Sequence, residues 1–158
     1  MKYFIYFIIC LVSIFLKGED SSAQSEIDAF ENLLSSEVSE ILFCELKRPF
    51  ESNLLTQIGS LDEEHQMNVL RLLNEAEDSD GVFPFVGVVG YLVFLDKSED
   101  VIAIVHCFER SNVVSVQSGY RRPKGIFLGA QNGEETVVYK QSPDLPVEFK
   151  KIRKRLEK

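Results

Sequence analysis

The sequence predicts an α+β protein: an antiparallel β-meander of about five strands, one earlier strand, two helices in the N-terminal half and a C-terminal helix. Apolar residues recur at helical spacing in three segments, residues 26–35, 60–77 and 145–156. Between residues 90 and 140 they instead alternate or form short runs, which is typical of strands. No repeat, low-complexity segment or long linker divides the chain, so we expect one domain.

The N-terminus has the composition of a secretory leader. Lys2 precedes an apolar run, Tyr3–Leu16, whose length suits a signal-peptide core and is short for a membrane span. Small residues at Ser21-Ser22-Ala23 predict cleavage before Gln24.

We therefore expect a signal peptide over residues 1–23, a single domain over residues 24–158, and export to the periplasm or the medium. An uncleaved signal anchor is the main alternative. Lipidation at Cys10 is disfavoured because Ile8 and Ile9, rather than a small residue, precede that cysteine.

The chain is acidic, with 17 Lys and Arg against 25 Asp and Glu and a net charge of −8. Removing the leader takes away two residues of each sign and leaves the net charge unchanged. An acidic domain repels phosphate backbones, so nucleic acid is not expected as a partner. The segment Glu148–Lys158 is the exception, because it holds six basic and two acidic residues.

The domain begins with a predicted helix over residues 26–35, with Ser25 as its N-cap. Its apolar residues at helical spacing are Ile27, Phe30, Leu33 and Leu34. A strand is expected over Val38–Leu46, where apolar residues fall on one side at a period of two; a continued helix is the alternative. After Pro49 we expect a loop.

A second helix is expected from Ser60, which forms a capping box with Glu63. Its predicted buried stripe consists of Val69, Leu70, Leu73 and Ala76. The segment Asp78–Gly81 should end this helix.

Strands dominate the next fifty residues. "YLVFLD" and "VIAIVHCF" are expected to form an antiparallel hairpin around Lys97–Asp100, and "NVVSVQ" to follow as the next strand. "GIFLGA" and "ETVVYK" flank Asn132-Gly133, a strong hairpin signal.

Asp144 should cap a last helix. Its apolar stripe, Leu145, Phe149, Ile152 and Leu156, is expected to dock onto the sheet while its basic residues face outward. Basic residues near a helix C-terminus complement the helix dipole. A basic amphipathic segment also predicts weak contact with a membrane surface as an alternative role.

His106 and Cys107 are the most reactive neighbouring residues in the sequence. In a strand their side chains point to opposite faces, so they cannot act as a catalytic pair. Metal binding would have to recruit His65, His106 and the cysteines from separate elements without close ligand spacing. We predict no catalytic residue, no metal and no cofactor.

Cys44 and Cys107 would be the two cysteines of the exported chain. An oxidising compartment permits a disulfide between them, which would stabilise the fold by about 4 kcal/mol in the chain-entropy model. The alternative is that both are small buried apolar residues.

Two further segments are candidate binding sites. Arg121, Arg122 and Lys124 lie together in "SGYRRPKG" and could bind a carboxylate or phosphate, although a solvated turn is the simpler interpretation. Phe83 and Phe85 in "VFPFVGVVG" are core residues or line a partner-binding groove.

The segments "LDEEHQMNVLRLLNEAE", "VFPF" and "YLVFLDKSEDVIAIVHCFER" together resemble a group of uncharacterised exported bacterial domains. In that group a helix leads to a Cys-Phe segment, and a later strand ends in Cys-Phe-x-Cys. The resemblance spans about Val38–Asn112. Val82 and Arg110 replace two of the group's three cysteines, so only Cys107 is kept. The resemblance implies export and the α+β order, and no activity.

The function we expect is therefore an exported, non-catalytic domain that binds a macromolecular partner or a cell-envelope component. Two alternatives remain open. One is an envelope hydrolase using His106 with Asp96 and Glu109, and the other is a carrier of small apolar ligands that uses Val82–Gly90.

Overall fold

The computed structural model of the protein describes residue 30 and residues 33–34, 36–46, 53–79, 87–108, 111–129 and 137–157. Two helices and nine strands lie in these residues. In chain order they are β1 (Glu40–Leu46), β2 (Leu54–Ser60), α3 (Glu63–Asn74), β3 (Glu77–Asp78), β4 (Val88–Leu95), β5 (Val101–Phe108), β6 (Val113–Gln117), β7 (Gly119–Arg122), β8 (Gly125–Leu128), β9 (Val137–Gln141) and α4 (Leu145–Leu156).

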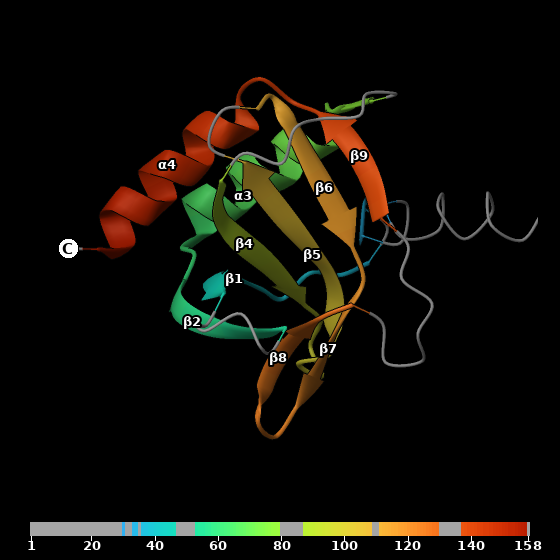
Figure 1. The fold of residues 1–158 in the computed structure, drawn as a ribbon, viewed down its shortest axis with the longest axis vertical. Helices are drawn as coiled ribbons and strands as arrows, with labels where there is room; N and C mark the ends of the chain where they lie inside the picture. The colour runs from blue at the N-terminus through green and yellow to red at the C-terminus, as the bar shows by residue number, and fades with distance from the viewer. Residues whose placement is uncertain are drawn as a thin grey trace, which may run out of the picture.

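All nine strands belong to one antiparallel sheet (Figure 1), in the order β3-β9-β6-β5-β4-β1-β2-β8-β7. The predicted α+β fold, with three helices on a meander of about five strands, is therefore wrong. The described chain is mostly sheet, because three segments expected to be a loop or the end of a helix pair as β2, β3 and β7.

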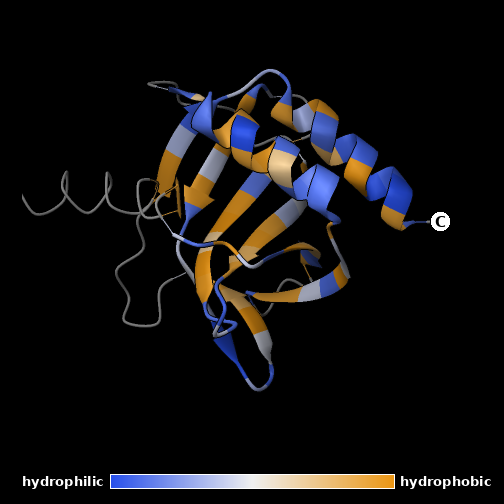
Figure 2. Cartoon of the chain, turned by 180° about the vertical axis from the view of Figure 1, so that it is seen from behind, coloured by the Kyte–Doolittle hydropathy of each residue, from blue (hydrophilic) through white to orange (hydrophobic). Residues whose placement is uncertain are grey.

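The helices α3 and α4 lie side by side and cover one face of the sheet (Figure 2). Between them and the sheet lies a core that includes Phe43, Phe94, Val105 and Phe149. Figure 2 shows apolar and hydrophilic residues alternating along both helices, and the apolar residues Val69, Leu73, Phe149 and Ile152 are the ones buried against the sheet. Burial of this continuous apolar layer is the main force that holds helices and sheet together.

A second core lies on the opposite face of the sheet, around Leu42, Tyr91 and Ile104. Strand β7 folds back toward β5 here. A Cβ atom on Gly119 would lie 2.2 Å from Cδ1 of Ile104, so this approach requires glycine. The central strands β4 and β5 are consequently apolar on both faces, as the sequence of β5 predicts.

The hairpin of β4 and β5 is confirmed, with Tyr91 opposite His106. The hairpin around Asn132-Gly133 is wrong. Strand β8 pairs with β2 and β7, whereas β9 pairs with β6 and β3. Residues 130–136 themselves lie outside the described residues.

Two details of the helices differ from prediction. Ser60 is the last residue of β2, so the N-cap of α3 is Asp62, whose side chain accepts a hydrogen bond from the His65 backbone. The buried residues of α3 are Val69, Leu72 and Leu73. Of the predicted first helix, Phe30, Leu33 and Leu34 are described and helical, and its other residues lie outside the described part.

The docking of α4 is confirmed. Leu145, Phe149 and Ile152 are buried, and the ring of Phe149 meets that of Phe43 edge to face at 6.1 Å. Asp144 stands at the N-cap, but its side chain makes no capping hydrogen bond. Among the described helices, neither is long and apolar enough to cross a membrane.

Candidate functional site

The structure does not bring the two predicted disulfide partners together. Cys44 lies in the core on the face of the sheet opposite α3 and α4, Cys107 lies in the core under these helices, and β4 separates their strands. Both are free, buried thiols. Burial raises the pKa of Cys44 to about 12 and raises that of Cys107 further, so both thiols are kept protonated and unreactive.

His106 is held in an apolar setting that does not suit catalysis. Its ring meets Tyr91 edge to face at 4.7 Å, and its Nε2 has no hydrogen-bond partner in the described structure. Burial lowers its pKa to about 4. Asp96 lies at the far end of the hairpin, where its carboxylate accepts hydrogen bonds from the backbones of Ser98 and Asp100. Glu109 lies outside the described residues.

The cations at Arg121, Arg122 and Lys124 lie at the tip of the hairpin formed by β7 and β8. Arg121 pairs with Glu99 at 2.8 Å, and the guanidinium of Arg122 lies 5.1 Å from the ring centre of Tyr120. Two of the three cations therefore already have intramolecular contacts. The other candidate surface, Phe83 and Phe85, lies outside the described residues.

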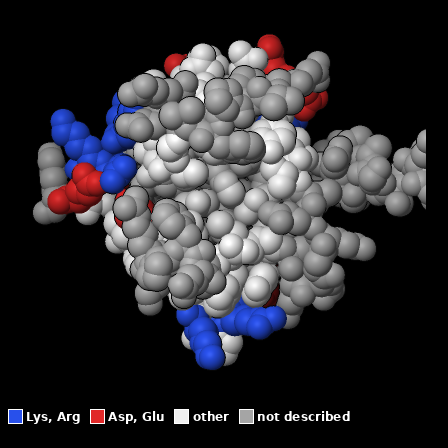
Figure 3. All heavy atoms as spheres, in the orientation of Figure 1, with Lys and Arg blue, Asp and Glu red and all other residues white. Residues whose placement is uncertain are grey.

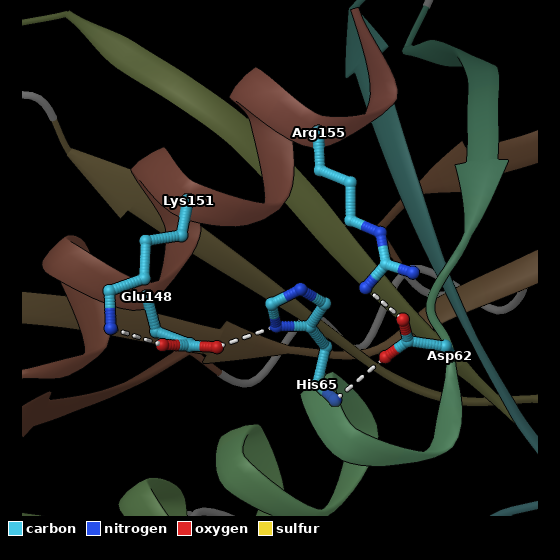
Figure 4. A network of polar contacts seen from close by, with 5 residues as sticks. All are labelled: Asp62, His65, Glu148, Lys151 and Arg155. Atoms are coloured by element: carbon cyan, nitrogen blue, oxygen red, sulfur yellow. Dashed lines mark hydrogen bonds and ion pairs between the residues drawn. The ribbon is translucent and has the colours of Figure 1, made fainter. Parts of the chain in front are cut away.

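A polar network joins α3 to α4 (Figure 4). Nδ1 of His65 lies 2.7 Å from Oε1 of Glu148, whose Oε2 accepts a hydrogen bond from Lys151 at 3.2 Å. Burial by itself would raise the pKa of Glu148, but the hydrogen bonds from His65 and Lys151 lower it overall. His65 is thus an interhelical contact and not the solvated residue that its acidic sequence neighbours suggest.

Asp62 ties the end of α4 to the start of α3 in the same network. One of its oxygens caps α3, and the other pairs with Arg155 (Figure 4). The backbone hydrogen bond from His65 and the charge of Arg155 lower the pKa of Asp62. These contacts fix the outward face of α4 relative to the sheet.

The sheet opens beside α4. Strands β1 and β4 pair from Glu40 opposite Leu95 to Cys44 opposite Tyr91, and the ladder then stops although both strands continue. The β1 residues beyond this point pair only with β2. A hollow lies here, lined by Glu45, Leu46, Gly87, Val88, Val89, Gly90, Tyr91 and Arg153.

A second hollow continues from the first onto α4, sharing Val88, Val89 and Arg153 with it. Its remaining lining residues are Lys150, Lys154 and Glu157. We call the two hollows together the β4–α4 groove. The first hollow is lined mainly by apolar side chains and backbone, with Glu45 and Arg153 at its border. The second is lined by three cations and Glu157 beside the two valines.

The charges along the groove are only partly neutralised. Arg153 pairs with Glu157 at 2.8 Å and with Glu45 at 3.5 Å. Lys150 and Lys154 are exposed, lie one helical turn apart and have no ion-pair partner in the described part of the chain. Figure 3 shows Lys and Arg gathered over α4, with a separate basic cluster at the β7–β8 tip.

Within the described chain, no three histidine, cysteine or acidic side chains are grouped so as to hold a metal ion. The basic face of α4, which the sequence predicts, coincides with the candidate site, because Lys150, Arg153 and Lys154 line the second hollow. The groove beneath it was not predicted, because it depends on where the pairing of β1 and β4 stops. Val88 and Val89 belong to Val82–Gly90, the segment predicted for a carrier of small apolar ligands, but nothing in that segment indicates where the pairing of β1 and β4 stops.

No protein-family model matches the chain, and no curated protein or solved structure is detectably similar to it. The resemblance to exported bacterial domains therefore stays a prediction. The candidate site has to be interpreted from its own chemistry.

Proposed function

We propose that the protein is an exported, non-catalytic domain that binds an anionic partner, a macromolecule or a cell-envelope component, through α4 and the β4–α4 groove. The observation that carries the proposal is the pair Lys150 and Lys154. In a chain of net charge −8, these neighbouring ammonium groups have no ion-pair partner among the residues that the structure describes, and they line a surface hollow.

Lys150 and Lys154 stand four residues apart on α4 and carry the same charge. Like charges at positions i and i+4 of a helix repel each other by a few tenths of a kcal/mol, so an anion placed between them relieves this repulsion. The interhelical contacts of Glu148 and Asp62 hold α4 in one orientation, which presents both lysines together. A preorganised cationic face binds an anion at a lower entropic cost than mobile side chains do.

The non-catalytic part of the proposal rests on the candidate residues. His106 is half-buried against Tyr91 and lies at the other end of the hairpin from Asp96, Cys107 is a buried thiol, and Nδ1 of His65 is engaged by Glu148. In these positions the side chains stabilise the fold. Export rests on the leader, residues 1–23.

Binding to lipid vesicles tests the anionic-partner proposal. The full chain should sediment with phosphatidylglycerol vesicles at low salt and not with phosphatidylcholine vesicles. The double variant Lys150→Glu/Lys154→Glu should weaken binding at least tenfold, because each reversal removes an attraction of about 1 kcal/mol and adds a repulsion.

The matched control is Arg122→Glu/Lys124→Glu, which makes the same charge change at the β7–β8 tip. It should bind nearly as well as the wild type. An equal loss in both double variants would show that only net charge matters, and binding to neutral vesicles would exclude an electrostatic site.

A further inference from the structure

We propose that the β4–α4 groove binds a single anionic lipid, with the headgroup between Lys150 and Lys154 and the alkyl chain along Val88, Val89 and Leu46. This inference rests on the proposed function and specifies its ligand. A polyanion would need only the lysines, whereas the groove continues beyond them onto an apolar surface.

The apolar end exists because the sheet opens. Beyond Tyr91, the side of β4 that would continue the ladder with β1 has no strand beside it in the described structure. Val88 is 44% exposed there, although its neighbours along β4 are buried. An exposed valine on a central strand leaves apolar area that an alkyl chain would remove from water.

The cationic end adjoins this surface directly. Lys150, Arg153 and Lys154 line the hollow that also contains Val88 and Val89. Arg153 is already paired with Glu157 and Glu45, so the lysines supply the charge available to a headgroup. An elongated site with a charged end and an apolar end matches an amphiphile and not a uniformly charged polymer.

Close packing among β1, β4 and α4 holds the groove in one shape. Gly90, which lines the first hollow, has no room for a side chain, because a Cβ atom would lie 2.6 Å from Cζ of Phe43. Phe43 in turn packs against Phe149 of α4. The strand floor and the helix wall of the groove are therefore fixed to each other through one buried aromatic pair.

Alkyl phosphates of different length, used as monomers, test the inference by calorimetry on the full chain. Octyl phosphate should bind at least tenfold more tightly than ethyl phosphate, since each buried methylene contributes several-fold in affinity. Val88→Gln should remove most of this difference. Val147→Gln changes a similarly exposed valine on α4, 51% exposed and outside the groove lining, and should leave it intact.

The outcomes separate the two proposals. Equal affinity for both phosphates, or equal effects of the two valine variants, would overturn the lipid site even if binding to phosphatidylglycerol vesicles persists. Vesicle binding that the lysine reversals leave unchanged, or no binding of the wild type to phosphatidylglycerol vesicles, would instead overturn the proposed function. Circular dichroism melting of each variant confirms that the fold is retained.

Discussion

At the scale of single residues, His106 links the interior of the sheet to pH. Its pKa falls from the ordinary 6.5 to about 4 because burial penalises the charged ring. Protonation therefore favours the unfolded chain. The contribution of His106 to stability is greatest above pH 6.5, is lost as the pH falls toward 4, and changes no further below that value.

We expect this group to cost up to about 3 kcal/mol of unfolding free energy between pH 7 and pH 4. Urea unfolding at several pH values measures it. The His106→Phe variant keeps an aromatic contact with Tyr91 and lacks the titration, so its stability should fall less over this range. Parallel curves for the two proteins would contradict the assignment.

Gly90 is a second residue with a measurable role. The Cβ atom of an alanine there would overlap the ring of Phe43, which is fully buried and cannot move freely. We expect Gly90→Ala to destabilise the protein by about 1–3 kcal/mol, as overpacking of a core does. The shift in urea midpoint reports the change.

Gly59→Ala is the control for Gly90→Ala. A Cβ atom at Gly59 would meet only the end of the Leu156 side chain, which is half-buried and flexible. Gly59→Ala should therefore lower the free energy of unfolding by clearly less than Gly90→Ala does. A larger effect at Gly59 than at Gly90 would show that Phe43 is not fixed.

At the scale of elements, the periodicity of apolar residues correctly predicted the features that depend on neighbours in the sequence. The hairpin of β4 and β5 and the apolar stripe of α4 follow from short-range periodicity. Strand β2 was missed because its exposed residues Thr56, Gln57 and Ile58 hide any alternation, and its partners β1 and β8 provide the pairing. The hairpin predicted from Asn132-Gly133 is wrong for the same reason, because β8 and β9 pair with strands distant in the sequence and not with each other.

The predicted capping box of Ser60 and Glu63 does not form, because Ser60 belongs to the preceding strand. Ser60 continues the β2 ladder opposite Leu42, which leaves Asp62 as the first side chain able to reach the His65 backbone. At the candidate site, the basic residues of α4 were visible in the sequence. The groove was not, because it is produced by two strands that diverge.

The interhelical pair of His65 and Glu148 should couple α3 to α4 energetically. A double-mutant cycle with His65→Gln and Glu148→Gln is expected to give a coupling of about 1 kcal/mol, measured from urea unfolding. The exposed pair of Arg71 in α3 and Glu75 at its C-cap serves as the reference and should give only a few tenths of a kcal/mol. Equal couplings would mean that the interhelical contact is no stronger than a surface ion pair.

At the scale of the whole molecule, the sheet divides the interior into two separate cores. Cys44 belongs to one and Cys107 to the other. Iodoacetamide should therefore modify neither residue in the native protein and both after unfolding in urea without reductant. Peptide mass spectrometry distinguishes them, and a peptide linking Cys44 to Cys107 would contradict the structure.

The order of strands in the sheet also has a consequence for how the molecule is made. Strand β2 can complete its pairing only with β8, where Leu54 lies opposite Phe127. Strand β3 likewise pairs with β9, where Glu77 lies opposite Gln141. Pairings this distant along the chain form slowly, because the entropy of closing a long loop is lost before any contact compensates it. Both ends of the sheet therefore remain incomplete until nearly the whole polypeptide has been synthesised. A chain that folds late in this way remains unfolded for longer, which would suit the proposed export, because a secretory channel for unfolded polypeptides requires that state.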